Sequence, residues 1–323
     1  MSHLYSREFR PLVRQLAINV WPGPVFAKRK LLVSGMPRSG TSWVAKLISL
    51  AEGVSYYFEP DNTLSRDYTF KYLGINDNAA LLQTFMRDTF KGRVNSDYVI
   101  AEQGLVDILR HPLSHTVLAK VVHLPLALDW INHNFPDVVM VQVIRHPVPV
   151  FQSWKVRDWD PGYNLGLLLK QEPLMAGPLA PYRSVMQAAD SYWTQAAALW
   201  SAIVKMQYLQ HKDNFFMVEH EWLCFDPVPR VRSLIEGVGL EWNSNIENFL
   251  TKGGDGQVSG PGYGKWRNPS SEINKWKNKV SQSEMDEIWS VMACFDLPCY
   301  KNLEIIPEVS HCPGTPQLTR ESV

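Results

Sequence analysis

The residues that could do chemistry begin with the stretch VSGMPRSGTSW at positions 33–43, which follows a short apolar run. Gly35 and Gly40 match the phosphate-binding pattern GxxxxGK[ST], except that Thr41 replaces its lysine. A positive charge stands three residues before Thr41, at Arg38. We expect this loop to join a strand to a helix, so the stretch predicts a phosphate or sulfate site.

The groups that would hold such an anion are the backbone N–H groups of Ser39, Gly40, Thr41 and Ser42, at a helix N-terminus whose dipole also favours negative charge. The Arg38 guanidinium can add charge-assisted hydrogen bonds of about 1.5–3 kcal/mol each. The alternative is a glycine turn that only enters a helix. Both the context and the arginine favour anion binding over that alternative.

A second cationic group follows the apolar run VVMVQVIRHP, which predicts a buried strand with Arg145 at its end. A nucleoside triphosphatase needs a carboxylate for magnesium at such a position, whereas an arginine repels the metal and attracts another anion. Ser153 lies eight residues beyond Arg145, two helical turns along, and could face the same anion. The pattern indicates a ligand with phosphates at two points and no metal. A surface arginine and a helix serine are the alternative.

Alternating apolar runs and helical patterns must position these groups. This order predicts an α/β fold, a three-layer parallel β-sheet flanked by helices in a P-loop-like nucleotide-binding arrangement, with its ligand crevice at the carboxyl ends of the strands. We expect strands at Lys30 to Ser34, Val54 to Phe58, Thr116 to Val122, Val138 to Ile144 and Asn214 to Val218, and helices at Ser42 to Ala51, Leu124 to Asn134, Val148 to Arg157 and Ser184 to Gln210.

The domain organisation is expected to be simple, because no linker-like composition interrupts the 323 residues. We expect a single domain over 1–323, with an N-terminal extension at 1–29 and an irregular C-terminal tail at 300–323. Two segments rich in proline and glycine, 158–182 and 253–269, are too long for ordinary connections. They are expected to be lids or binding loops.

The amino-acid composition limits the kinds of partner that the chain is expected to bind. Lysine plus arginine equal aspartate plus glutamate at 32 each, so no global positive field recruits nucleic acid or a membrane, and the partner is expected to be small. No run approaches the roughly 20 apolar residues of a membrane span, and the N-terminus lacks the apolar core of a signal peptide. We expect a cytoplasmic protein. Its four cysteines lack CxxC spacing, which favours reduced thiols over a metal site.

The segments PRSGTSW and VIRHPVPVFQSW together resemble the sulfotransferases that use 3′-phosphoadenosine 5′-phosphosulfate (PAPS), and the likeness extends from Leu31 to about Met292. The resemblance implies that the first loop binds the 5′-phosphosulfate and that the second motif binds the 3′-phosphate. It assigns Arg38, Ser39, Gly40, Thr41 and Ser42 to the 5′ side and Arg145 and Ser153 to the 3′ side.

Further segments fit this resemblance. Trp43 occupies the position of a tryptophan that stacks on adenine in the cytosolic enzymes, a contact worth about 1–3 kcal/mol, although a core tryptophan is an equal alternative. The stretch GPGYGKWRNP resembles the mobile loop that closes over the 3′-phosphate, with Lys265 and Arg267. The stretch VEHEWL resembles the helix that follows the last strand, with His220 and Trp222 where the family has tyrosine and aspartate.

Sulfuryl transfer needs a base for the acceptor and positive charge on the leaving phosphate. Arg38 and Lys120 suit the second task, because an unpaired lysine would be costly to bury in the strand TVLAKVV. For the base, Glu59 in YYFEP resembles the glutamate of carbohydrate and tyrosine sulfotransferases, and His123 in HLPLAL resembles the histidine of the small-molecule enzymes. We rank Glu59 slightly ahead, and the other group could orient the acceptor.

The acceptor is expected to be a small metabolite or a sugar, with residues 158–182 as a lid over an apolar or ring-shaped compound. The alternative for this segment is that it packs on the edge of the core. Two other functions share part of the pattern. A P-loop kinase would need the missing lysine and a magnesium carboxylate, and a non-catalytic nucleotide-binding protein would keep Arg38 and Arg145 without turnover.

Overall fold

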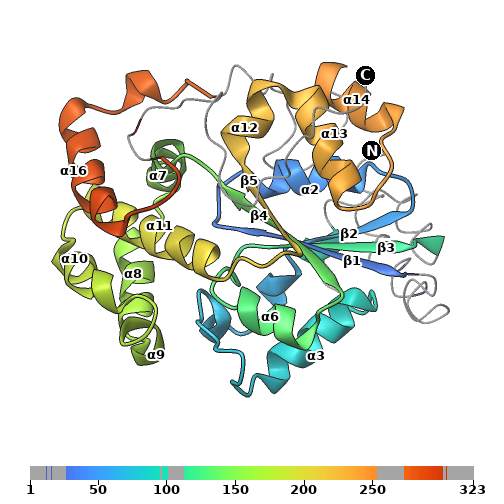
Figure 1. Ribbon diagram of the computed structural model, residues 1–323, viewed down its shortest axis with the longest axis horizontal. Helices are drawn as coiled ribbons and strands as arrows, with labels where there is room; N and C mark the ends of the chain where they lie inside the picture. Colours follow the sequence, from blue (N-terminus) through green and yellow to red (C-terminus); the bar gives the residue numbers. More distant parts are fainter. Residues whose placement is uncertain are drawn as a thin grey trace.

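A five-stranded, all-parallel sheet forms the centre of the computed structural model (Figure 1). The structure describes residues 27–94, 97–100, 113–252 and 273–300, together with residues 12, 16 and 303. The strand order is β2-β3-β1-β4-β5. Every expected strand is confirmed to within one residue at each end: β1 is Arg29–Gly35, β2 Val54–Phe58, β3 Thr116–Val121, β4 Val138–Ile144 and β5 Phe215–Glu219.

The helices form layers on both faces of this sheet, as Figure 1 shows. Helices α3 (Ala80–Phe90) and α6 (Leu128–Asn134) cover one face, and α2 (Thr41–Ser49) and α13 (Pro227–Gly237) cover the other. Alternate residues of β1 serve the two layers, since Leu31 and Val33 pack with α2 and Leu32 packs with α3. This is the three-layer α/β architecture that the sequence predicts.

The remaining α-helices are α4 (Asp97–Ile100), α7 (Pro147–Lys155), α8 (Pro161–Leu169), α9 (Glu172–Met175), α10 (Arg183–Ala188), α11 (Tyr192–Leu209), α12 (His220–Phe225), α14 (Ser244–Lys252) and α16 (Gln282–Met292). Of these, α12 and α14 pack with α2 and α13 on the same face of the sheet. Short 3₁₀ turns include η1 (Pro60–Thr63), η2 (Arg66–Tyr68), η4 (Ala180–Tyr182) and η6 (Ala293–Phe295).

Three expected elements differ from the structure. The helix expected over Leu124 to Asn134 begins later, at Leu128. The helix expected over Ser184 to Gln210 is divided into α10 and α11, because Ser191 begins a new helix with a capping box to Thr194. The segment 158–182, expected to be a loop, contains α8, α9 and η4. Each of these helices has a proline in its first turn, where proline favours the start of a helix. The proline and glycine content alone did not distinguish helix starts from loops.

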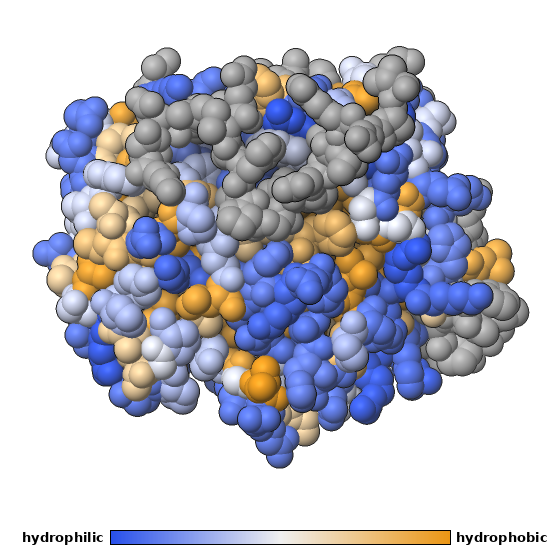
Figure 2. All heavy atoms as spheres, in the orientation of Figure 1, coloured by the Kyte–Doolittle hydropathy of each residue, from blue (hydrophilic) through white to orange (hydrophobic). Residues whose placement is uncertain are grey.

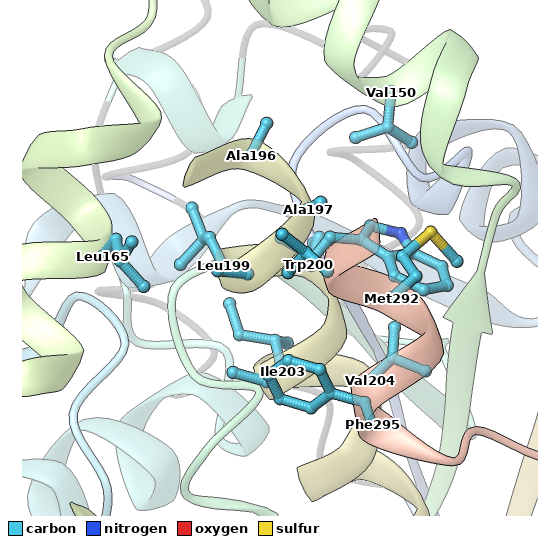
Figure 3. Close-up of a cluster of buried hydrophobic side chains, with 14 of the residues drawn as sticks. Val150, Leu165, Ala196, Ala197, Leu199, Trp200, Ile203, Val204, Met292 and Phe295 are labelled. Atoms are coloured by element: carbon cyan, nitrogen blue, oxygen red, sulfur yellow. The ribbon is translucent and has the colours of Figure 1, made fainter. Parts of the chain in front are cut away.

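Besides the two clusters of buried side chains on the faces of the sheet, a third hydrophobic cluster forms where α7, α8 and α16 surround α11. In Figure 3 the side chains of Trp200 and Ile203 from α11 lie beside Met292 and Phe295 from the C-terminal helices, and Leu199 lies toward Leu165 of α8. The 158–182 segment contributes buried side chains to the same core, namely Leu165, Leu168, Leu174, Met175 and Leu179. These residues pack as part of the core, and about 1.5–3 kcal/mol is gained for each large apolar side chain that is fully buried.

Hydrophilic and apolar residues are interspersed over the described part of the face in Figure 2. Within the described residues, no helix has both the length and the apolar character to cross a membrane. Among the described residues, Cys294 is an exposed free thiol and Cys299 a buried one. The expected mobile loop with Lys265 and Arg267 lies outside the described residues, as do nearly all of the N-terminal extension and the C-terminal tail.

Candidate functional site

The candidate site lies where the strands of the sheet end. Central strand β1 has β3 on one side and β4 on the other, and parallel strands with this order open a crevice at their carboxyl ends. The segments that follow all five strands therefore begin at this edge of the sheet. They carry the glycine loop after β1, Glu59 after β2, His123 after β3, Arg145 after β4 and His220 after β5.

The glycine loop is folded tightly between β1 and α2. Ser39 closes the turn, since both its hydroxyl and its N–H donate to the Met36 carbonyl, at 2.7 and 3.1 Å. Gly35 has no room for a side chain, because a Cβ there would lie 2.5 Å from the Val143 carbonyl oxygen. Gly40 precedes α2 with φ of 90°, and a Cβ there would lie 2.1 Å from Cδ2 of His220. Only glycine fits both positions.

The two cationic motifs meet in space. Nε of Arg38 donates to the Ser153 hydroxyl at 2.8 Å, although 115 residues separate them in the chain. Nη1 of Arg145 donates to the Arg38 carbonyl at 3.2 Å. The residues predicted for the 5′ and 3′ sides of the ligand therefore belong to one cluster on the loop, the β4 exit and α7.

Arg145 contacts Glu221 and Trp200, two residues that the sequence did not identify as its partners. Its Nε lies 3.8 Å from a carboxylate oxygen of buried Glu221 on α12, and its carbonyl accepts from the Trp200 indole at 3.2 Å. Glu221 also accepts from the Tyr300 hydroxyl at 2.5 Å and from the His146 N–H at 3.2 Å. Burial raises the pKa of Glu221, and the charge of Arg145 together with the Tyr300 hydrogen bond partly offsets that effect.

Two buried histidines pack around this cluster in their neutral form. Burial lowers the pKa of His146 to about 3, with a further contribution from Arg145, and its ring stacks on Trp276 at 4.6 Å between centroids. Burial, followed by the charge of Arg145, also lowers the pKa of His220 well below its ordinary value. Half-buried Trp43 lies edge-on to His220 with centroids 5.5 Å apart, so it is both a core residue of α2 and a neighbour of the loop.

Glu59 and Lys120 form a buried ion pair at the exits of β2 and β3. The Lys120 ammonium, on a side chain that is 1% exposed, contacts Oε1 of Glu59 and lies over the Phe58 ring at 4.5 Å. Oε2 of Glu59 accepts from the Tyr98 hydroxyl at 2.6 Å and from the Asn62 amide at 3.1 Å. The lysine thus has a carboxylate partner from a strand exit 61 residues away, and both oxygens of Glu59 are engaged.

His123 is held by a different carboxylate. Asp61, at the start of η1, accepts on Oδ2 from the N–H groups of Val122 and His123 at 2.8 and 2.7 Å. The same oxygen lies 3.4 Å from Nδ1 of the His123 ring. Burial lowers the pKa of His123, but the hydrogen bond and charge of Asp61, with a contribution from Glu59, outweigh burial and Lys120, so the pKa is raised overall.

Asp61 and Glu221 are the site residues that sequence reasoning missed. The signal for Asp61 was its position two residues after Glu59 in FEPD, and the signal for Glu221 was a carboxylate in an otherwise apolar helix after a buried strand. A surface hollow of about 400 Å³ lies at the amino-terminal edge of the sheet, lined by Lys28, Arg29 and His115 among others. It is at the opposite end of the strands from these groups and does not contribute to the site.

The parallel sheet and its glycine loop before α2 define an α/β protein of the P-loop-like class. The model of the sulfotransferase family matches residues 31–244, which include the loop, the β4 exit and α7. The chain belongs to this family and is a sulfotransferase. A comparison with curated proteins gave no significant match.

Solved sulfotransferases are distantly similar to the chain. The sulfotransferase domain from the Synechococcus PCC 7002 olefin synthase is 15% identical, with 83% of this chain and 94% of that chain covered and a TM-score of 0.47. The sulfotransferase domain from the curacin biosynthetic pathway is 16% identical, with 83% and 98% covered and a TM-score of 0.44. Mouse sulfotransferase SULT7A1 complexed with PAP is 12% identical, with 88% and 91% covered and a TM-score of 0.40.

Proposed function

We propose that this sulfotransferase takes its sulfuryl group from PAPS and transfers it to a hydroxyl or amine of a small metabolite or a sugar. The observation that carries the proposal is the cluster of Arg38, Ser153 and Arg145 at the carboxyl ends of β1 and β4. A nucleotide with phosphates at both the 3′ and 5′ positions presents two separate anions, and this cluster offers a cationic group to each.

The residues present fit such a nucleotide. Gly35 and Gly40 allow the loop to fold tightly against Val143 and His220, which a Cβ at either position would prevent. The Arg145 guanidinium is fixed by the buried Glu221 carboxylate on one side and by the Arg38 carbonyl, which supports a role in binding an anion in a set orientation. In this proposal the 5′ side is bound by Arg38 and the loop residues Ser39, Gly40, Thr41 and Ser42, and the 3′ side by Arg145 and Ser153, with Trp43 beside adenine. Lys265 and Arg267 remain proposed ligands outside the described residues.

When bound, the donor supplies an activated sulfuryl group whose bond to the phosphate breaks as the acceptor bond forms, and the electron pair leaves with adenosine 3′,5′-bisphosphate. The chain supplies charge and a base. Lys120 and Arg38 are the cations proposed to stabilise the charge that develops on the phosphate. His123 and Glu59 are the two candidates for the group that receives the acceptor proton.

The acceptor side is proposed to lie next to His123 and the 158–182 segment. Gln171, at the junction of α8 and α9, accepts from the Tyr72 N–H at 2.7 Å and donates to the Phe70 carbonyl at 2.9 Å. The Phe70 N–H in turn donates to the His123 carbonyl at 2.8 Å. These hydrogen bonds connect the helical segment to the backbone of the candidate base, so a displacement of α8 and α9 would change the position of His123.

A P-loop kinase is not favoured, because Thr41 replaces the lysine of its motif and β4 ends at Arg145. Calorimetry with adenosine 3′,5′-bisphosphate and with ATP plus magnesium separates the functions. We expect the bisphosphate to bind more tightly, and tighter binding of ATP would refute the donor assignment. Radiolabelled PAPS with a panel of phenols, alcohols, sugars and amines then identifies the acceptor. Nucleotide binding without transfer to any of them would favour a non-catalytic role.

A further inference from the structure

Glu59 and Asp61 are the two carboxylates that follow β2, and they have different hydrogen-bond partners. This difference bears on which group is the base. Glu59 uses Oε1 for the Lys120 ammonium and Oε2 for Tyr98 and Asn62. Together these contacts occupy three of the roughly four lone-pair positions of the carboxylate. A general base must instead have an unoccupied lone pair within reach of the acceptor.

His123 meets this requirement. Its side chain is 26% exposed, while the Asp61 carboxylate beside its Nδ1 is fully buried. An Nδ1–H that points at Asp61 leaves Nε2 without a proton, and Nε2 is then the acceptor atom of the ring. The backbone of His123 is also fixed on both sides, because its N–H donates to Asp61 and its carbonyl accepts from Phe70.

We propose that Asp61 is a positioning residue that fixes the tautomer and orientation of His123, the histidine candidate for the base, while Glu59 is the counter-ion of Lys120. The inference rests on the proposed function. In the step concerned, the acceptor hydroxyl gives its proton to Nε2 and its oxygen keeps the electron pair for the new bond to sulfur. The proton passes from Nε2 to solvent before the next turnover.

The structure also shows why Asp61 is suited to this role. It has no exposed side-chain surface, so its negative charge acts on the ring through a medium of low dielectric constant. The charged groups that face His123 are Asp61, Glu59 and Lys120. The effects of Glu59 and Lys120 on the His123 pKa oppose one another, and the Asp61 charge has the largest effect of the three.

The test begins with the wild-type protein without ligand. The ¹⁵N shifts of labelled histidine, with His123 assigned from its loss in His123→Gln, report which ring nitrogen carries the proton above the His123 pKa. We expect the Nδ1–H tautomer, and an Nε2–H tautomer would overturn the proposal. This readout needs neither donor nor acceptor, and it stands even if an Asp61 variant does not fold.

Asp61→Asn is the matched substitution, because its amide oxygen can still accept from the two backbone N–H groups while the charge is lost. We expect the pKa of His123 to fall, because the hydrogen bond and charge of Asp61 that raise it are lost, and the acidic limb of the pH profile of kcat to move to lower pH with it. We expect kcat to fall about 10- to 100-fold with little change in KM. Asp67→Asn, an exposed carboxylate bonded to Ser65, is the control and is expected to change neither quantity.

A purely structural role for Asp61 predicts a different result. Stability would fall in Asp61→Asn, but the tautomer and the pKa of His123 would be unchanged, and that outcome would reject the inference. Glu59→Gln is expected to keep the acidic limb of the pH profile, whereas His123→Gln is expected to lose it; the reverse would make Glu59 the base. Calorimetry with adenosine 3′,5′-bisphosphate on the same samples tests the donor site separately.

Discussion

Gly40→Ala tests whether the geometry of the glycine loop controls nucleotide binding. The new Cβ would lie 2.1 Å from Cδ2 of His220, and ordinary contact would require the two groups to separate by about 1 Å. His220 cannot retreat easily, because it is buried against Trp43 and Cys224. A left-handed backbone costs a non-glycine residue about 1–2 kcal/mol, and overpacking costs about 1–3 kcal/mol. We therefore expect the free energy of unfolding to fall by about 2–5 kcal/mol.

The assays are urea unfolding and calorimetry with adenosine 3′,5′-bisphosphate. We expect the dissociation constant of Gly40→Ala to rise at least about tenfold, because the loop N–H groups shift with the displaced backbone. Gly166→Ala is the matched control, since Gly166 lies in α8 and a Cβ at this position would meet nothing within 4 Å. It is expected to raise the free energy of unfolding by about 0.5–1 kcal/mol and to leave binding unchanged.

A double variant separates the two costs. Adding His220→Ala to Gly40→Ala removes the clash and leaves the backbone strain, so part of the loss from Gly40→Ala should be recovered relative to His220→Ala alone. If Gly40→Ala unfolds at the wild-type urea concentration and binds the bisphosphate with wild-type affinity, the loop is not the anion site and the reasoning fails.

Three further predictions concern charges of the site. Arg145→Ala should weaken binding of adenosine 3′,5′-bisphosphate by about 1.5–3 kcal/mol in calorimetry, and equal weakening of adenosine 5′-monophosphate would remove Arg145 from the 3′ side. Glu59→Gln should lower the free energy of unfolding by about 3–5 kcal/mol because it leaves the Lys120 ammonium unpaired, and the double variant with Lys120→Met should lose less in the same urea titration; an equal or larger loss would contradict the pairing. His146 has a depressed pKa of about 3, so its stabilising contribution is present above about pH 6.5 and is lost as the pH falls. His146→Gln should reduce the stability difference between pH 7 and pH 5 by about 2 kcal/mol, and an unchanged difference would show that His146 is charged in the fold.

The sheet could be predicted from the sequence because its strands are buried on both faces. Runs such as VVMVQVI at 138–144 are continuously apolar, a pattern that few other elements produce. The 158–182 segment was expected to be a loop, since its prolines and glycines also occur at turns. Whether proline begins a helix or ends one depends on the residues that pack against it, here Leu165 and Leu168 in the α11 core.

The site was only partly predictable for a related reason. The loop and Arg145 are local motifs, so their chemistry is visible in a few consecutive letters. The pairing of Glu59 with Lys120, and of Asp61 with His123, depends on β2 lying beside β3 in the sheet. Strand order is a property of the folded chain, and the sequence shows two carboxylates near each other without showing which cation or ring each one meets.

Backbone strain offers an independent argument for where the function lies. Six non-glycine residues among those described have positive φ, and two of them, Asp158 and Asp296, are aspartates, which tolerate this conformation. The other four are Arg38, Glu59, Phe70 and Tyr300. Each costs about 1–2 kcal/mol and persists only where its surroundings enforce it.

All four of these residues lie at the proposed site. Arg38 donates to Ser153, Glu59 pairs with Lys120, Phe70 holds the His123 carbonyl, and Tyr300 donates to the carboxylate behind Arg145. Strain that was unrelated to function would be expected at turns throughout the fold. Its concentration on the loop, the base candidates and the support of Arg145 indicates that the chain gives up stability to hold these groups in fixed positions before a ligand arrives.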